Sequence, residues 1–205
     1  MSSIQGLFFE PVPILVASII GSVLSAAGVT TITIPAHADG DLIVAFGSNR
    51  TNAASPTPAG YTSIATGIAN PIGGGSDRSV NMVYKFSSGA AETLTFDGGS
   101  ATASTVPYSG CLIFRRAVGV DGGSGISSNT TGGTLAVPAL TLTRPPSVVI
   151  AFSFYCGATT GLTAAPAGWI VTNGMAYAEY LNAWAGGNFT LDTTGALIGA
   201  VVEIY

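Results

Sequence analysis

The chain has 205 residues, of which only 8% are charged and 47% are hydrophobic, and its formal net charge at pH 7 is −4. Its six lysines and arginines are too few for the clustered cations that phosphate binding needs, so we expect no nucleic-acid partner. Soluble domains usually have about 25% charged residues, and monomers rarely expose large apolar patches. This composition therefore favours a protein that packs against neighbouring subunits.

The first long apolar stretch, residues 13–27, is shorter than the roughly 20 apolar residues of a membrane-spanning helix, and serine and glycine interrupt it. A secretory signal begins with basic residues, whereas the first basic residue of this chain is Arg50. We therefore expect no membrane partner and no leader. Residues 1–28 should instead form an N-terminal arm with the first strand or strands, and Leu7, Phe8 and Phe9 are its candidate docking residues.

Most of the chain consists of short runs rich in Val, Ile, Thr, Phe and Tyr between Gly, Pro, Ser and Asn clusters, which is typical of an all-β protein. We expect strands at residues 13–20, 29–35, 41–48, 61–66, 79–87, 92–96, 110–118, 134–143, 147–156, 169–173, 176–184, 188–192 and 196–205. Residues 29–121 then form a first β repeat and residues 134–205 a second. The Gly-, Ser- and Thr-rich residues 122–133 connect them, and both repeats together form one sandwich.

The two repeats share a pattern: an apolar strand, a proline, an apolar strand ending in Ala-Phe, a loop, and Pro-Ala-Gly followed by an aromatic residue. Alternate residues of a strand share a face, so one row of each Ala-Phe strand is predicted to be core. These core residues are Leu42, Val44, Phe46, Val148, Ile150 and Phe152. The opposite rows are apolar too, so both faces should be covered. We predict an antiparallel, jelly-roll-like β-sandwich built from two internally repeated halves.

The Pro-Ala-Gly-aromatic elements have a mechanical interpretation. Proline fixes φ and glycine supplies a positive φ, so the two predict a tight turn, and the aromatic residue that follows can plug the end of the core. The alternative is an aromatic platform for sugar binding, which the recurrence in both copies disfavours. The predicted turn and plug residues are Pro58, Gly60, Tyr61, Pro166, Gly168 and Trp169.

The sequence offers little catalytic chemistry. His37, near Asp39 and Asp41, could form a His–Asp couple or a metal site, but the chain lacks a Gly-x-Ser-x-Gly nucleophile motif and the oxygen spacing of a calcium loop. Asp-Gly before a strand is an ordinary turn signal, and the other acids are scattered. We therefore expect no enzyme, no catalytic, cofactor-binding or metal site, and no cofactor.

The chain has two cysteines, Cys111 and Cys156, which are too few for a disulfide framework. Both lie in apolar runs, where a free cysteine behaves as a small buried hydrophobic residue. Their redox state stays open at this point.

Residues 31–121 resemble a pattern of bacteriophage virion structural proteins, in which a GDL-x-VAF strand is followed by P-x-G-[YW]-T. Related domains also occur in bacterial surface proteins. The ending Phe114-Arg115-Arg116 departs from the usual tyrosine–arginine–glycine of that pattern. The resemblance implies a capsid-decorating or tail-associated β-sandwich and no enzymatic residues. The matching segments are residues 31–36, 40–42, 58–62, 78–80, 84–85, 92–96 and 110–121.

The sequence thus favours a non-enzymatic phage structural protein that decorates or cements the capsid or forms part of the tail through subunit packing. The alternative is a receptor- or carbohydrate-binding module of a tail fibre or surface adhesin, with a glycan receptor as a candidate partner. We expect the other partners to be capsid or tail subunits and further copies of the chain, with a trimer favoured. The expected location is the virion, assembled in the host cytoplasm.

Overall fold

The structure is a computed structural model, and it describes residues 17–25, 29–49, 56–69, 78–96, 109–128, 134–155, 162–172, 175–191 and 197–205. Within these ranges every regular element is a β-strand, and all strand pairs are antiparallel. No helix in the described ranges is long and apolar enough to span a membrane. The predicted all-β, antiparallel sandwich is therefore confirmed.

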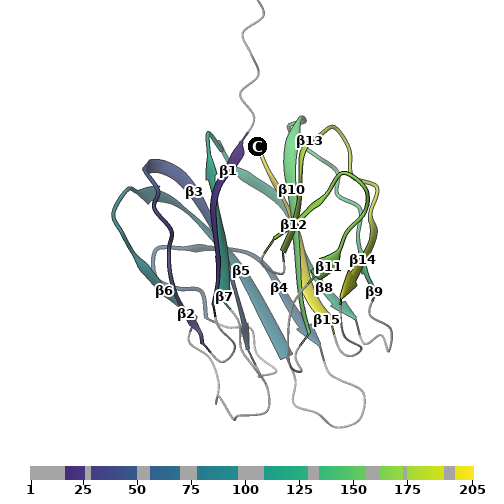
Figure 1. Ribbon diagram of the computed structural model, residues 1–205, viewed down its shortest axis with the longest axis horizontal. Coiled ribbons are helices and arrows are strands. Elements are labelled where there is room, and N and C mark those ends of the chain that lie inside the picture. Colours follow the sequence, from purple (N-terminus) through teal and green to yellow (C-terminus); the bar gives the residue numbers. More distant parts are fainter. Residues whose placement is uncertain are drawn as a thin grey trace, which may run out of the picture.

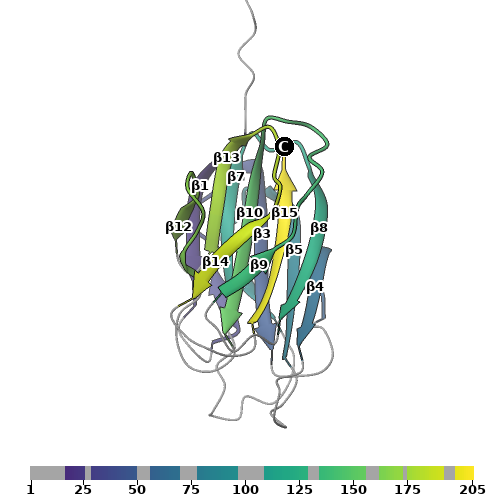
Figure 2. The ribbon, with the colours of Figure 1, turned by 90° about the vertical axis from the view of Figure 1, so that its right-hand side faces the viewer.

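Two five-stranded sheets form the middle of the molecule and face each other (Figures 1 and 2). The first sheet runs β1 (Ser18–Leu24), β7 (Ser109–Arg115), β3 (Asp39–Asn49), β5 (Arg78–Ser88) and β4 (Thr62–Ala69). The second runs β8 (Val120–Ser128), β15 (Leu197–Ile204), β10 (Ser147–Tyr155), β13 (Met175–Leu181) and β12 (Ile170–Thr172).

Two smaller sheets cover the outer faces of this pair (Figure 1). Strands β2 (Thr31–Thr33) and β6 (Thr93–Thr95) lie on the first sheet. Strands β9 (Thr134–Val137), β14 (Gly187–Leu191) and β11 (Leu162–Ala164) lie on the second. The molecule is thus a central sandwich with one further thin layer on each side.

The internal repeat of the sequence is a repeat of strand order. In the first sheet the order β1-β7-β3-β5-β4 corresponds, strand for strand, to β8-β15-β10-β13-β12 in the second. The pair β2–β6 likewise corresponds to β9–β14, with β11 added. With β1 and β8 added in front of the two sequence repeats, each repeat supplies one large and one small sheet, and the two repeats pack against each other through their large sheets.

The central core lies between the large sheets and is made by alternate residues of their middle strands. Leu42, Val44 and Phe46 of β3 pack there with Val148 and Ile150 of β10, and each is at most 3% exposed. These are five of the six side chains that alternation placed in the core. The side chain of the sixth, Phe152, lies outside the described residues.

The opposite rows of the same strands build two outer cores. Ile43 and Ala45 pack under β2 and β6, with Ile32 and Phe96 among their neighbours. Val149 and Ala151 pack in the same way under β9 and β14, together with Val137 and Phe189. Strands β3 and β10 are therefore covered on both faces, which explains why they read as continuous apolar runs.

The structure differs from the sequence expectation mainly in two places. Residues 122–128, expected to be connector, form most of β8, because an edge strand obtains its ladder hydrogen bonds from β15 whatever its side chains are. Strand β9 ends at Val137 rather than at residue 143, since Pro138 has no N–H to donate. Strand β11 was not anticipated.

The arm residues Leu7, Phe8 and Phe9 lie outside the described residues.

The close packing of the central core leads to a testable prediction at Gly110 of β7. A Cβ atom there would lie 2.4 Å from Cζ of Phe46 and 2.9 Å from the Val23 carbonyl oxygen. Gly110→Ala should therefore lower the free energy of unfolding by about 1–3 kcal/mol, because neither a packed ring nor backbone yields easily. Chemical denaturation measures this change.

Gly21→Ala on the adjacent strand β1 is the matched control. The nearest atoms to a Cβ there are 3.4 Å away, so we expect a change within about 0.5 kcal/mol. Equal effects of the two substitutions would contradict the packing described here.

Candidate functional site

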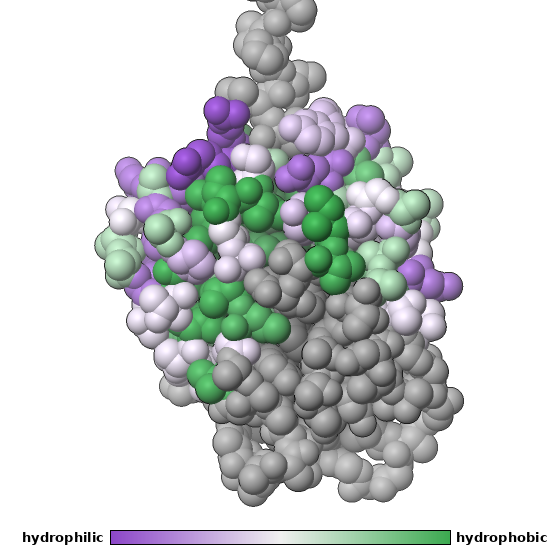
Figure 3. Space-filling view, in the orientation of Figure 1, coloured by the Kyte–Doolittle hydropathy of each residue, from purple (hydrophilic) through white to green (hydrophobic). Residues whose placement is uncertain are grey.

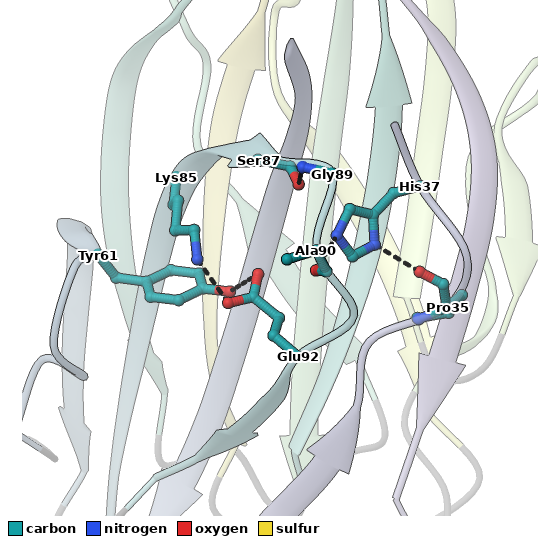
Figure 4. A network of polar contacts seen from close by, with 8 residues as sticks. All are labelled: Pro35, His37, Tyr61, Lys85, Ser87, Gly89, Ala90 and Glu92. Carbon is teal, nitrogen blue, oxygen red and sulfur yellow. Dashed lines mark hydrogen bonds and ion pairs between the residues drawn. The ribbon is translucent and has the colours of Figure 1, made fainter. Parts of the chain in front are cut away.

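Polar side chains gather on the outer face of the first repeat, where the loop before β3 meets the loop between β5 and β6 (Figure 4). Tyr61 follows the turn before β4, Lys85 projects from the outer row of β5, and Glu92 precedes β6. The ring of His37 lies beside them, in the loop between β2 and β3. Tyr61, Lys85, Glu92 and His37 form the candidate functional site.

Glu92 is the centre of the first part of this cluster. One of its carboxylate oxygens accepts a hydrogen bond from the Tyr61 hydroxyl at 3.2 Å, and the other lies 2.5 Å from Nζ of Lys85. The same ammonium group is 5.1 Å from the centroid of the Tyr61 ring. Burial, the nearby Glu92 charge and this hydrogen bond raise the pKa of Tyr61, so the phenol stays protonated. The Tyr61 hydroxyl, the Lys85 ammonium group and the Glu92 carboxylate are thus one another's interaction partners.

The turns before both aromatic residues have the same geometry. The N–H of Tyr61 donates to the Pro58 carbonyl at 3.1 Å, and Gly60 has φ of 80°. In the second repeat, the N–H of Trp169 donates to Pro166 at 3.1 Å, and Gly168 has φ of 87°. Positive φ at the third position is the reason for glycine in such a turn.

The two aromatic side chains pack against the outer cores rather than the central one. Tyr61 lies against the core under β2 and β6. The ring centroids of Trp169 and Trp184 are 4.7 Å apart, and that of Phe189 is 5.0 Å from Trp169. Trp184 also donates its indole N–H to the Pro138 carbonyl at 2.9 Å. The plugging role expected of Tyr61 and Trp169 thus concerns the outer layers.

His37 connects two loops. Its Nδ1 lies 2.6 Å from the carbonyl oxygen of Pro35, and its Nε2 lies 3.1 Å from that of Ala90 (Figure 4). Both ring nitrogens are therefore occupied by backbone carbonyls. The imidazole joins the loop before β3 to the loop before β6, which is a structural role.

Asp41 is bound elsewhere and makes no hydrogen bond to His37 among the described contacts. Nε and Nη2 of Arg115 donate to its two oxygens at 3.1 and 3.0 Å, and the N–H of Ala38 donates at 2.7 Å. The hydrogen bond from Arg115 outweighs burial and holds the pKa of Asp41 below its ordinary value. Within the described ranges, no three His, Cys, Asp or Glu side chains are grouped so that they could hold a metal ion.

Glu203 of β15 is a buried carboxylate that sequence reasoning missed. It is 0% exposed and accepts hydrogen bonds from Ser147 Oγ at 2.6 Å, from Thr143 N and Oγ1 at 2.8 and 3.1 Å, and from Arg144 N at 3.2 Å. Burial raises the pKa of Glu203, but these donors outweigh it and hold the pKa below its ordinary value. A lone acid between Val202 and Ile204 was the only signal in the sequence.

Two open hollows lie beside the side chains of the candidate site. One, of about 400 Å³, lies beside Tyr61 and Glu92 and includes the threonines Thr57, Thr93 and Thr95. The other, of about 350 Å³, lies beside His37 and is otherwise lined by apolar and backbone groups. Hydroxyl groups and a paired carboxylate can form hydrogen bonds to a ligand, but they supply no activated nucleophile.

Cys111 is free and buried in β7. Burial is the largest cause that raises the pKa of its thiol, to about 12, so the reactive thiolate is scarce at neutral pH. Cys156 lies outside the described residues.

The Glu203 contacts predict a pH effect on stability. Because the pKa is depressed in the folded state, the contribution of this carboxylate is complete above its ordinary pKa of 4.5 and is lost as the pH falls through the folded value. Glu203→Gln should cost about 1–3 kcal/mol at neutral pH, since its amide NH₂ faces hydrogen-bond donors. The difference from the native chain should shrink in acid. Urea denaturation across the pH range measures both effects.

Glu179→Gln on β13 makes the same change at a half-buried site and is the control. A Glu203→Gln cost that stays constant from neutral to acid pH would contradict the role of the charged form.

Comparisons with known proteins add little to this picture. No protein-family model and no curated protein matches the chain. Among solved structures, the crystal structure of the STIV MCP is similar, with 8% sequence identity and a TM-score of 0.25 over 92% of this chain and 96% of that one. So distant a likeness says nothing about activity or partners.

Proposed function

We propose that this chain is a non-enzymatic structural protein of a bacteriophage particle, which attaches to the capsid or tail by packing against other subunits. The observation that carries the proposal is a surface with few charges on which large apolar side chains stay exposed (Figure 3). These side chains are Ile20, Val29, Phe86, Val118, Ile170 and Tyr180, with exposed fractions from 37% to 70%. Subunit packing would bury such a surface.

The hydrogen bonds of three polar side chains also support a structural role. His37 holds two loops together, Asp41 binds Arg115 and a backbone N–H, and Glu203 anchors the residues before β10. Each of these side chains fixes the position of a connection between strands. They stiffen the module instead of presenting reactive atoms to a substrate.

The outer face of the small sheet β2–β6 is neutral and hydroxyl-rich. Thr31, Thr33, Thr93 and Thr95 point outward, and the Thr31 and Thr95 hydroxyls are 3.0 Å apart. A neutral face allows neighbouring subunits to approach closely, because no like charges have to be brought together. Close approach is what a repeated component of a particle requires.

The sequence resemblance to phage structural proteins gives this packing role its biological setting. It also gives the arm a function: Leu7, Phe8 and Phe9 precede the edge strand β1, and in this proposal they dock on a neighbouring subunit. The virion is then the location of the protein, and other capsid or tail subunits are its partners.

Immunogold electron microscopy of virus particles purified from the source of the chain tests this function. We expect antibodies against the folded chain to label the head or the tail at regular positions. Label confined to the tip of the tail would favour the receptor-binding alternative, with the hollow beside Tyr61 and Glu92 as the first place to look for a glycan. Abundant chain in the lysate with none on the particles would contradict the proposal.

A further inference from the structure

The central sandwich has one closed side and one open side. Strands β4 and β8, the edge strands of the two large sheets, lie side by side along the closed side (Figure 2). On the other side the edge strands are β1 and β12, and over their described residues, 18–24 and 170–172, they make no comparable contact. This open side faces the viewer in Figure 1.

Apolar side chains remain exposed along the open side. Figure 3 shows this face, with apolar residues gathered in its middle. Ile20 lies at an irregularity in the pairing of β1 with β7 and is 37% exposed, while Ile170 of β12 is 50% exposed. At the closed side Ile64 of β4 packs against the central core, as Ile19 and Leu24 of β1 do at the open side. Over the described residues, the open side therefore lacks the contact between edge strands that the closed side has.

Two of the devices that protect a sheet edge from pairing are missing from the strands of the open side, although β12 is short and the pairing of β1 is irregular. Natural edge strands commonly carry lysine or proline, which prevents pairing with other chains. Strand β1 has the sequence SIIGSVL and β12 the sequence IVT, so neither contains a charge or a proline. A neutral surface is also where two copies with a net charge of −4 can meet with little repulsion.

The chain itself shows which surface fits this one. Strands β12 and β1 are the counterparts, in the two repeats, of β4 and β8. The contact between β4 and β8 is made inside the molecule, whereas its counterpart between β12 and β1 is not. A second copy offers both missing partners at once: its β12 for β1, and its β1 for β12. Two such contacts around one twofold axis form a closed, isologous interface.

We propose that two copies of this chain pair through their open sides, with β1 of each copy against β12 of the other. This pair replaces the trimer favoured by the sequence. It specifies the packing surface within the structural role proposed above and rests on that role only for its biological setting.

Light scattering after size-exclusion chromatography of the purified full chain tests the pairing. We expect a mass of twice 20.4 kDa at micromolar concentration. Ile20→Glu and Ile170→Glu should each raise the dissociation constant at least about tenfold, since each would bury an unpaired charge. Phe86→Glu is the matched control, because Phe86 is 42% exposed on β5, next to β4 on the closed side, and its substitution should leave the mass unchanged.

A charge-swap variant tests the arrangement of the strands. Ile20→Glu combined with Ile170→Lys should restore pairing, because Glu of one copy would then lie near Lys of the other. If like strands met instead, Glu would face Glu and the double variant would stay monomeric, which would overturn the arrangement. Circular dichroism checks that every variant remains folded.

A monomeric native chain, or equal disruption by Phe86→Glu, would overturn the inference. Neither result touches the location of the protein on particles, which the immunogold experiment decides separately. Conversely, a pair in solution with no label on particles would contradict the virion role and leave the interface standing.

Discussion

The structure depends on one constraint: strands β3 and β10 are apolar on both faces, and both faces must be removed from water. Burying apolar surface is the dominant favourable contribution to folding, at about 25 cal/mol per Å². A single sandwich covers only one face of each sheet. The chain meets the constraint by packing the two repeats against each other and by covering each outer face with a small sheet. The need to cover both faces of β3 and β10 therefore explains why the molecule has four layers.

The few polar groups have roles that suit this arrangement. The loops that connect one layer with the next lie outside the sheets, so their backbone N–H groups need hydrogen-bond acceptors other than a neighbouring strand. Asp41 and Glu203 accept hydrogen bonds from backbone N–H groups just before β3 and β10, the two central strands. Buried carboxylates with several donors hold such connections firmly. The surface that remains has few charges and several exposed apolar side chains, which suits it to assembly.

Much of the fold could be predicted from the sequence because the signal was local. Alternation along residues 42–46 and 148–152 gave the core rows, and Pro-Ala-Gly gave the turns. The role of Glu203 could not be predicted, because its partner Thr143 is 60 residues away and no spacing rule connects them. Strand β8 is held by pairing with β15 and not by its glycines and serines. The open side could not be foreseen either, since a repeat predicts equal edges, whereas over the described residues β4 and β8 are in contact and β1 and β12 make no comparable contact.

The central claim is that the two repeats fold as one body around the shared core between β3 and β10. Native-state hydrogen exchange tests it most directly, because amides that exchange only on global unfolding mark the cooperative unit. We predict that the slowest amides lie in both β3 and β10 and share one free energy of opening, equal to that of global unfolding. Slow exchange confined to one repeat, with the other opening separately at lower free energy, would contradict the claim.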